Sequence, residues 1–148
     1  MIDSREKHIL NFKKGSVLKE VIKQKLDTGD YSALGYEDKI CFERKSPGDA
    51  CSTLLGGHKR FKRELERAQK LDYFCIIIEC SFTRFINKDF PNSHYVRVYG
   101  EQLIQTLFTI QEKYGVDLVF CNNRQESASY IRQKLKNYIK NNPLEEEK

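Results

Sequence analysis

The sequence predicts an α/β domain in which helices flank a mixed β-sheet. Short apolar runs with the two-residue period of a strand alternate along the chain with longer segments that have the 3.6-residue period of an amphipathic helix. Near the N-terminus, two strand-like segments surround a glycine-containing turn, which favours an antiparallel hairpin. A hairpin followed by alternating helices and strands is typical of an α/β fold with a mixed sheet.

The predicted hairpin occupies the first third of the chain. Its first strand covers residues 20–26 and is followed by a turn that ends at Gly29. Its second strand covers residues 38–45, and the bend between the strands lies near Gly35.

Helices and strands alternate in the rest of the sequence. Helical periodicity covers residues 49–71, and Gly56-Gly57 is compatible with a break in it. A strand over residues 73–79 is apolar on both faces, as a strand covered by helices on each side requires. The remaining predicted elements are a loop with Pro91, a helix over 101–114 capped by Gly115, a strand over 116–121, and a helix over 124–140 with Asn123 and Glu126 as a capping box.

Length and composition indicate one compact domain. The chain has 148 residues, of which 39% are apolar, which is enough for a core. We assign residues 1–140 to a single domain and residues 141–148 to an acidic flexible tail. No apolar run approaches the ~20 residues of a membrane span, and the first residues lack the apolar stretch of a signal peptide. We therefore expect a cytoplasmic protein, or a nuclear one in a eukaryote.

Cysteine usage and net charge narrow the function classes. The five cysteines include no C-x-x-C pair, so buried free thiols are favoured over disulfides or a zinc site. The formal net charge is +5, which is compatible with a polyanionic partner. Many proteins of other functions carry a similar charge, so this observation alone does not identify the partner.

Three charged residues of the hairpin form a set with chemical meaning. Glu43 and Lys45 are two positions apart on a strand, so their side chains point to the same face. Asp30 comes from the neighbouring strand and can meet them. Asp49 opens the following helix and can approach the same place.

Phosphodiester hydrolysis requires such a combination of groups. Carboxylate oxygens bind Mg²⁺, which polarises a phosphate and activates water. A lysine beside them can stabilise the charge that develops during the reaction. The alternative is a surface hairpin with ordinary charges, and the short pattern Asp30…Glu43-x-Lys45 does not exclude it.

A longer string is more specific. Gly29-Asp30-Tyr31 followed by Glu43-Arg44-Lys45-x-x-x-Asp49 resembles the signature of the XPF/Hef family of structure-specific nucleases, whose fold is restriction-endonuclease-like. The resemblance extends over about residues 2–135. Further matching segments are Asp3-x-Arg5-Glu6, Arg60-Phe61-x-x-Glu64-Leu65 and Ile76-Ile77-Ile78-Glu79.

The resemblance implies roles for the signature residues. Asp30, Glu43 and Asp49 would bind Mg²⁺, for which Mn²⁺ could substitute. Lys45 would be the catalytic lysine. Arg44 belongs to the required triplet, but strand alternation places it on the opposite face, where it could brace a carboxylate or meet a phosphate.

Residues outside the signature are weaker candidates. By resemblance, Asp3 and Glu6 would complete the acidic cluster and Arg5 would bind phosphate. On the helix after the signature, a basic ridge lies opposite the apolar stripe and could follow a DNA backbone, although a solvated helix face is the slightly better explanation. The ridge consists of Lys59, Arg63 and Arg67, and Lys70 continues it.

The sequence therefore predicts a metal-dependent DNA endonuclease acting on branched or flapped DNA in repair, recombination or replication-fork processing. No recognisable motif for reading the major groove is present, which favours selection of DNA by shape. The resemblance also implies a homodimer, and a partner protein could supply selectivity. The alternatives are an inert DNA-binding scaffold of the same fold and a nuclease acting on ordinary duplex.

Overall fold

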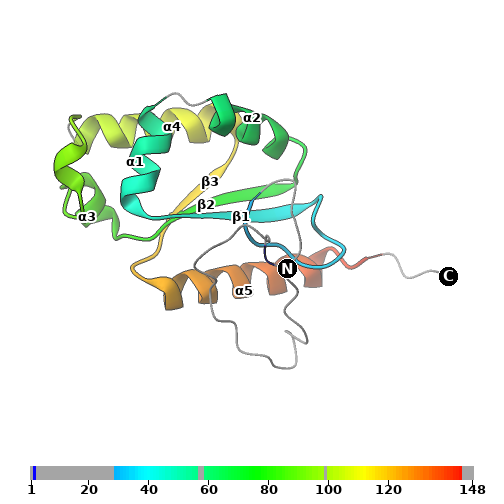
Figure 1. The fold of residues 1–148 in the computed structure, drawn as a ribbon. Coiled ribbons are helices and arrows are strands. Elements are labelled where there is room, and N and C mark those ends of the chain that lie inside the picture. The colour runs from blue at the N-terminus through cyan, green and yellow to red at the C-terminus, as the bar shows by residue number, and fades with distance from the viewer. Residues whose placement is uncertain (1, 3–28, 57–58, 99, 145–148) are drawn as a thin grey trace.

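The computed structural model describes residues 2, 29–56, 59–98 and 100–144. Its centre is a parallel sheet in the order β1 (Ile40–Lys45), β2 (Tyr73–Ile78) and β3 (Asp117–Phe120). Helices cover both faces of this sheet (Figure 1). The predicted α/β fold with flanking helices is therefore confirmed.

The central position of β2 follows from its composition. Its last five residues are buried, because side chains from both faces meet helices. One core cluster contains Ile76 and Ile78 together with residues of the helices on that face, and the other contains Cys75 and Ile77 together with Ile131 of α5 (Arg124–Asn141). The alternation of these four residues between the two clusters defines two cores, one on each side of the sheet.

An antiparallel contact adds the mixed character to the sheet. Tyr31 forms antiparallel bridges with Phe42 of β1 and with Ile2. The Phe42 carbonyl accepts from the Asp30 amide at 2.7 Å and from the Tyr31 amide at 3.1 Å. The second predicted strand is thus confirmed as β1, whereas the predicted strand over residues 20–26 lies outside the described residues.

Gly29 makes this pairing possible. Its φ of +80° is in the region that favours glycine, and an added Cβ would lie 2.9 Å from the Phe42 carbonyl oxygen. Glycine at this position therefore lets the chain place Asp30 beside β1.

The predicted break in the first helix is confirmed. Helix α1 (Pro47–Leu55) begins at Ser46, whose hydroxyl accepts from the Asp49 amide at 3.2 Å, and ends at Gly56. Helix α2 (Lys59–Ala68) follows and buries Phe61, Leu65 and Ala68.

The prediction of a plain loop around Pro91, between β2 and the helix expected over residues 101–114, is wrong in part. This segment contains a short helix, α3 (Phe82–Ile86), and a 3₁₀ turn, η1 (Ser93–Tyr95). Ser81 caps α3, and the Phe85 ring is stacked on Phe90 at 5.7 Å between centroids. A helix of five residues is too short to produce a recognisable 3.6-residue period.

The last two helices agree with prediction. Helix α4 (Gly100–Tyr114) is followed by Gly115 at φ +65°, the left-handed conformation of a helix C-cap. The Asn123 side chain caps α5 by accepting from the Glu126 amide at 2.9 Å. In return, the Glu126 carboxylate accepts from the Asn122 amide, so the second arm of the predicted capping box reaches one residue further back.

Helices α1 to α4 lie on one side of the sheet or at its end, and α5 covers the other face (Figure 1). All five cysteines are free and buried, as predicted. Within the described residues, none of the helices has the length and apolarity needed to cross a membrane. The division into a domain over 1–140 and a tail remains a prediction, and Tyr36 donates a hydrogen bond to the Asn142 carbonyl at 2.8 Å.

Candidate active site

Strand β1 brings two of the predicted catalytic residues together. Glu43 and Lys45 alternate with Phe42 and Arg44 along the strand, so they share the face covered by α2. The Lys45 Nζ lies 3.6 Å from the Glu43 Oε1, and both side chains are 14% exposed. The predicted side-by-side carboxylate and ammonium are therefore present.

Asp30 is fixed against the same strand. Its Oδ2 atom accepts a hydrogen bond from the Arg44 amide at 2.9 Å, and its own amide donates to Phe42. Backbone contacts on both sides of the residue thus orient the carboxylate. Its negative charge contributes to raising the pKa of Glu43.

The surroundings of Glu43 oppose its ionisation. Burial raises the pKa of Glu43 well above its usual value, and the negative charges of Asp30 and Glu64 raise it further, while Lys45 lowers it. Two neighbouring carboxylates therefore oppose the ionisation of Glu43, and Lys45, 3.6 Å away, favours it.

Helix α2 forms the other wall of this place. The Lys45 Nζ lies 5.6 Å from the centroid of the Phe61 ring, and Glu64 is one helical turn further along. The Oε1 atom of Glu64 is buried and has no hydrogen-bond partner among the described residues. Sequence analysis did not select Glu64 as a site residue, although its spacing of three from Phe61 placed both on one side of the helix.

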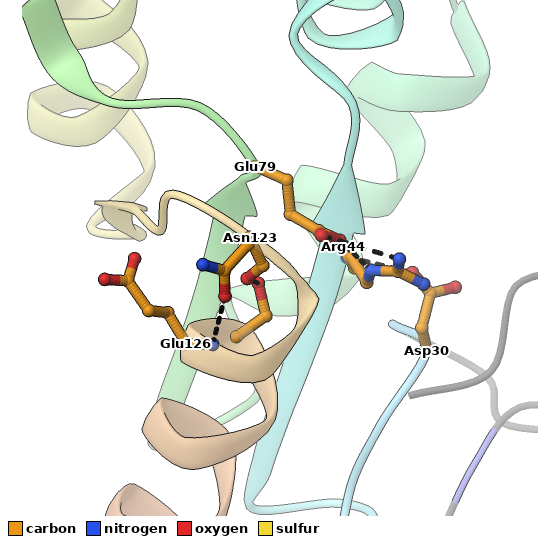
Figure 2. Close-up of polar contacts among 6 residues, drawn as sticks. Asp30, Arg44, Glu79, Asn123 and Glu126 are labelled. Atoms are coloured by element: carbon orange, nitrogen blue, oxygen red, sulfur yellow. Dashed lines mark hydrogen bonds and ion pairs between the residues drawn. The ribbon is translucent and has the colours of Figure 1, made fainter. Parts of the chain in front are cut away.

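Arg44 lies on the opposite face of β1, as strand alternation predicts. Its guanidinium is paired with the Glu79 carboxylate through Nε, and Nη2 is 3.5 Å from Glu79 Oε2. Figure 2 shows this pair between Asp30 and the start of α5. Arg44 is therefore paired with a carboxylate, and this pair links the ends of β1 and β2.

Asp49 lies in a different setting. It is an exposed residue of the first turn of α1, and it lines a cavity of about 670 Å³ between α1 and residues 91–98. The charges that shift the pKa of Glu43 come from Asp30, Glu64 and Lys45. In the part of the chain that the structure describes, no three His, Cys, Asp or Glu side chains lie at metal-binding spacing.

Comparison with known proteins identifies the family. The ERCC4 domain matches the chain over residues 2–134. The chain belongs to the ERCC4 domain family. The predicted resemblance to XPF/Hef nuclease domains is thereby confirmed.

Solved structures show that the ERCC4 domain fold is shared. The chain is similar to XPF from Aeropyrum pernix, with a TM-score of 0.69 and 22% identity over 99% of this chain. A structure of XPF from the same organism in complex with DNA gives a TM-score of 0.66 and 23% identity over 98% of this chain. The chain spans 65% and 66% of the length of those two chains. No match was found among curated proteins.

The other predicted site residues of this ERCC4 domain fall into two groups. Asp3, Arg5 and Glu6 lie outside the described residues. Lys59, Arg63 and Arg67 are exposed on α2, opposite the residues that the helix buries. The basic ridge therefore faces solvent on the helix whose inner face carries Phe61 and Glu64.

Proposed function

We propose that this ERCC4 domain is a metal-dependent DNA endonuclease. The observation that carries the proposal is the pairing of Glu43 and Lys45 on one face of β1, with Asp30 bound to the backbone of the same strand, in the order of the family signature. Carboxylates and a lysine at one point are the groups that phosphodiester hydrolysis requires.

The donor set fits a hard divalent cation. Asp30 and Glu43 supply carboxylate oxygens, and the buried Glu64 Oε1 lacks a hydrogen-bond partner among the described residues. Mg²⁺ and Mn²⁺ prefer oxygen ligands of this kind. We propose that Asp30 and Glu43 hold the ion, whereas Asp49 lines the separate cavity beside α1.

The ion and the residues around it would have different roles in the reaction. A bound Mg²⁺ or Mn²⁺ supplies polarisation of the scissile phosphate and of the attacking water. Lys45 can place its ammonium beside a phosphate oxygen, because Glu43 and the Phe61 ring hold its Nζ at the site. The Arg44 guanidinium pairs with Glu79, and the Arg44 backbone amide donates a hydrogen bond to Asp30. Arg44 therefore acts on the position of carboxylates and not on the substrate.

We propose that the substrate is branched or flapped DNA cut near a junction. The exposed ridge of Lys59, Arg63 and Arg67 offers contacts to phosphates, which carry no sequence information. Selection by backbone contacts alone depends on the shape and flexibility of the DNA. The protein of Aeropyrum pernix was solved with DNA, which supports the class of ligand.

Cleavage of labelled DNA tests the proposal. The protein should cut a flapped substrate with Mg²⁺ or Mn²⁺ and be inactive in chelator. Glu43→Gln, Asp30→Asn and Lys45→Ala should each lower the rate by about 100-fold or more, because each removes a group that acts in the transition state. Glu66→Gln, at an exposed position of α2, is the matched control and should cut at the wild-type rate.

Two outcomes would contradict parts of this proposal. Unchanged cleavage by all three variants would end the assignment of the site, and binding without cleavage by the wild-type protein would favour an inert scaffold. If a linear duplex of the same sequence were cut as fast as the flap, the preference for branched DNA would be wrong while the nuclease assignment stood.

A further inference from the structure

We infer that the cavity between α1 and residues 91–98 receives the base of an unpaired nucleotide, next to the phosphate that lies at the active site. The inference deepens the proposed function and rests on it, since it names a feature of the DNA that the same protein would bind. It assigns a role to a cavity that the phosphodiester chemistry of β1 does not use.

The cavity begins directly beside the active-site strand. Ser46, one of its lining residues, follows Lys45 in the chain, and consecutive Cα atoms are about 3.8 Å apart. Helix α1 then leads away from the end of β1 (Figure 1) and carries two further lining residues, Asp49 and Ser52. A DNA strand with one phosphate beside Lys45 therefore has a neighbouring nucleotide at the entrance of the cavity.

The fold holds both walls of the cavity in place. On one side, Ala50 and Leu54 of α1 are buried in the core, so the helix is fixed against the sheet. On the other side, the Lys88 ammonium donates a hydrogen bond to the Val96 carbonyl, and the Val96 amide donates to the Ser93 carbonyl at 2.9 Å. A cavity with fixed walls needs little reorganisation when a ligand enters.

The size and the apolar lining suit a nucleobase. The volume is about 670 Å³, which is in the range of cavities that hold small organic molecules. Pro47 and Leu55 line it from α1, and Val98 lines it from the other wall. Apolar side chains of this kind can pack on the two faces of a planar ring.

Polar groups that could recognise a nucleotide lie at the same cavity. Asp49 offers carboxylate oxygens that accept from the N–H groups of a base, and the Asn92 amide can both donate and accept. Arg97 adds a guanidinium, which can donate to a base carbonyl or to a phosphate. All three residues are exposed, so an incoming nucleotide breaks no buried contact of theirs.

An unpaired nucleotide fits this cavity better than a paired one. A base inside a duplex must first be unstacked and unpaired before a protein can enclose it, and this cost is smallest for a base that is already single-stranded. A flap or fork presents such a base beside its junction. The cavity would therefore give a small domain a preference for branched DNA without any reading of sequence.

Fluorescence anisotropy of the full chain with forked DNA tests the inference, and chelator prevents cleavage during the measurement. In a series of forks, one nucleotide at a time of the unpaired strand is replaced by an abasic residue. The wild type should lose about tenfold in affinity at one or two adjacent positions near the junction, because the base contacts are lost while the phosphate contacts remain. Abasic residues at other positions should have little effect.

Two variants connect this loss to the cavity. Ser52→Leu reduces the space at an exposed helical position, and it should bind the intact fork about tenfold more weakly than the wild type, with no further loss from the abasic residue. Ser129→Leu, at an exposed position of α5 across the sheet, is the matched control and should behave as the wild type does. Arg97→Gln should also weaken fork binding, and Arg132→Gln, exposed on α5, should do so less.

The possible failures of the inference and of the proposed function are distinguishable. If no abasic position mattered, or if Ser52→Leu kept the affinity and the abasic sensitivity of the wild type, the cavity would not receive a base, and cleavage with Mg²⁺ would still support the nuclease. If the abasic effect were present and absent in Ser52→Leu while the wild type cut no DNA with Mg²⁺ or Mn²⁺, the nuclease assignment would fail and the nucleotide site would stand.

Discussion

At the scale of single residues, the environment of Glu43 conflicts with its negative charge. Burial, Asp30 and Glu64 all raise its pKa, and Lys45 offsets them only in part. Such conflicts are common where a fold holds groups for chemistry and not for its own stability. The conflict has a consequence for stability that can be measured in the absence of metal.

The folded protein should become less stable as pH rises because of Glu43. Below its ordinary pKa of 4.5, Glu43 is protonated in both the folded and the unfolded state and has little effect. As pH rises through the higher pKa of the folded state, the unfolded chain has already released the proton, so folding is disfavoured. In chelator, Glu43→Gln should therefore melt at a higher temperature than the wild type near pH 8, with the difference vanishing near pH 4 (both approximate).

Glu66→Gln provides the control for this measurement, because Glu66 is exposed on α2. It should show no difference from wild type that grows with pH. Equal melting temperatures of Glu43→Gln and the wild type across the whole range would contradict the proposed environment of Glu43.

At the scale of elements, the Arg44–Glu79 pair links the ends of β1 and β2. The two side chains are 11% and 13% exposed, so removing one partner leaves the other charge nearly buried. Arg44→Ala should lower the free energy of unfolding by about 2 kcal/mol, as measured by urea denaturation. Arg44→Lys should recover only part of this loss, since an ammonium cannot contact both carboxylate oxygens in the planar geometry of arginine.

The pair of Arg84 and Asp89 is a control for this experiment. Its atoms are 3.5 Å apart, but the side chains are 54% and 73% exposed. Arg84→Ala should therefore change the free energy of unfolding by about 0.5 kcal/mol or less. An Arg44→Ala loss no larger than that of Arg84→Ala would show that the link between the strands contributes little.

The basic ridge of α2 has a consequence for DNA binding. Replacing Lys59, Arg63 and Arg67 with glutamine should weaken binding of all DNA shapes and reduce the dependence of affinity on salt, because each lost phosphate contact releases about one fewer counterion. Fluorescence anisotropy at several salt concentrations measures both effects. The matched variant replaces Arg132, Lys136 and Lys140, which are exposed on α5 across the sheet.

An equal loss in the two triple variants would contradict a specific role for the α2 ridge. It would indicate that net charge alone governs binding. A loss confined to the α2 variant would place the DNA backbone beside the helix that carries Glu64.

The elements were predictable to different degrees for physical reasons. Periodicity identified β2 and the long helices, because their residues face one or two cores. Helix α3 was missed because its five residues are too few to show a helical period, and because its Phe85 ring packs on Phe120, which is distant in sequence. Glu64 was missed for a similar reason, since its proximity to Glu43 arises from the packing of α2 on β1.

At the scale of the whole molecule, the candidate site depends on three segments that the sequence separates. Asp30 precedes β1, Glu43 lies on it, and Glu64 comes from α2. Sequence alone could place the first two together through the expected hairpin. It could not show that Asp49, expected in the same site, would line the cavity between α1 and residues 91–98.

The outer surface of α4 is the candidate contact surface for the predicted homodimer. Leu103, Ile104 and Leu107 are buried in the core, whereas Phe108 is 48% exposed on the same helix. Exposed aromatic side chains are enriched at the centres of protein interfaces, so Phe108 is the residue of this helix best placed for contact with a second copy. We propose that two chains associate through this surface.

Sedimentation at micromolar concentration tests the proposal. The wild type should sediment as a species of twice 17.4 kDa, and Phe108→Arg should shift it to the monomer, because a charge would be buried at the contact. Leu34→Arg is the control, since Leu34 is 63% exposed but lies in the segment between Tyr31 and β1. A wild-type protein of 17.4 kDa only would contradict the dimer. A dimer unaffected by Phe108→Arg would place the contact elsewhere on the molecule.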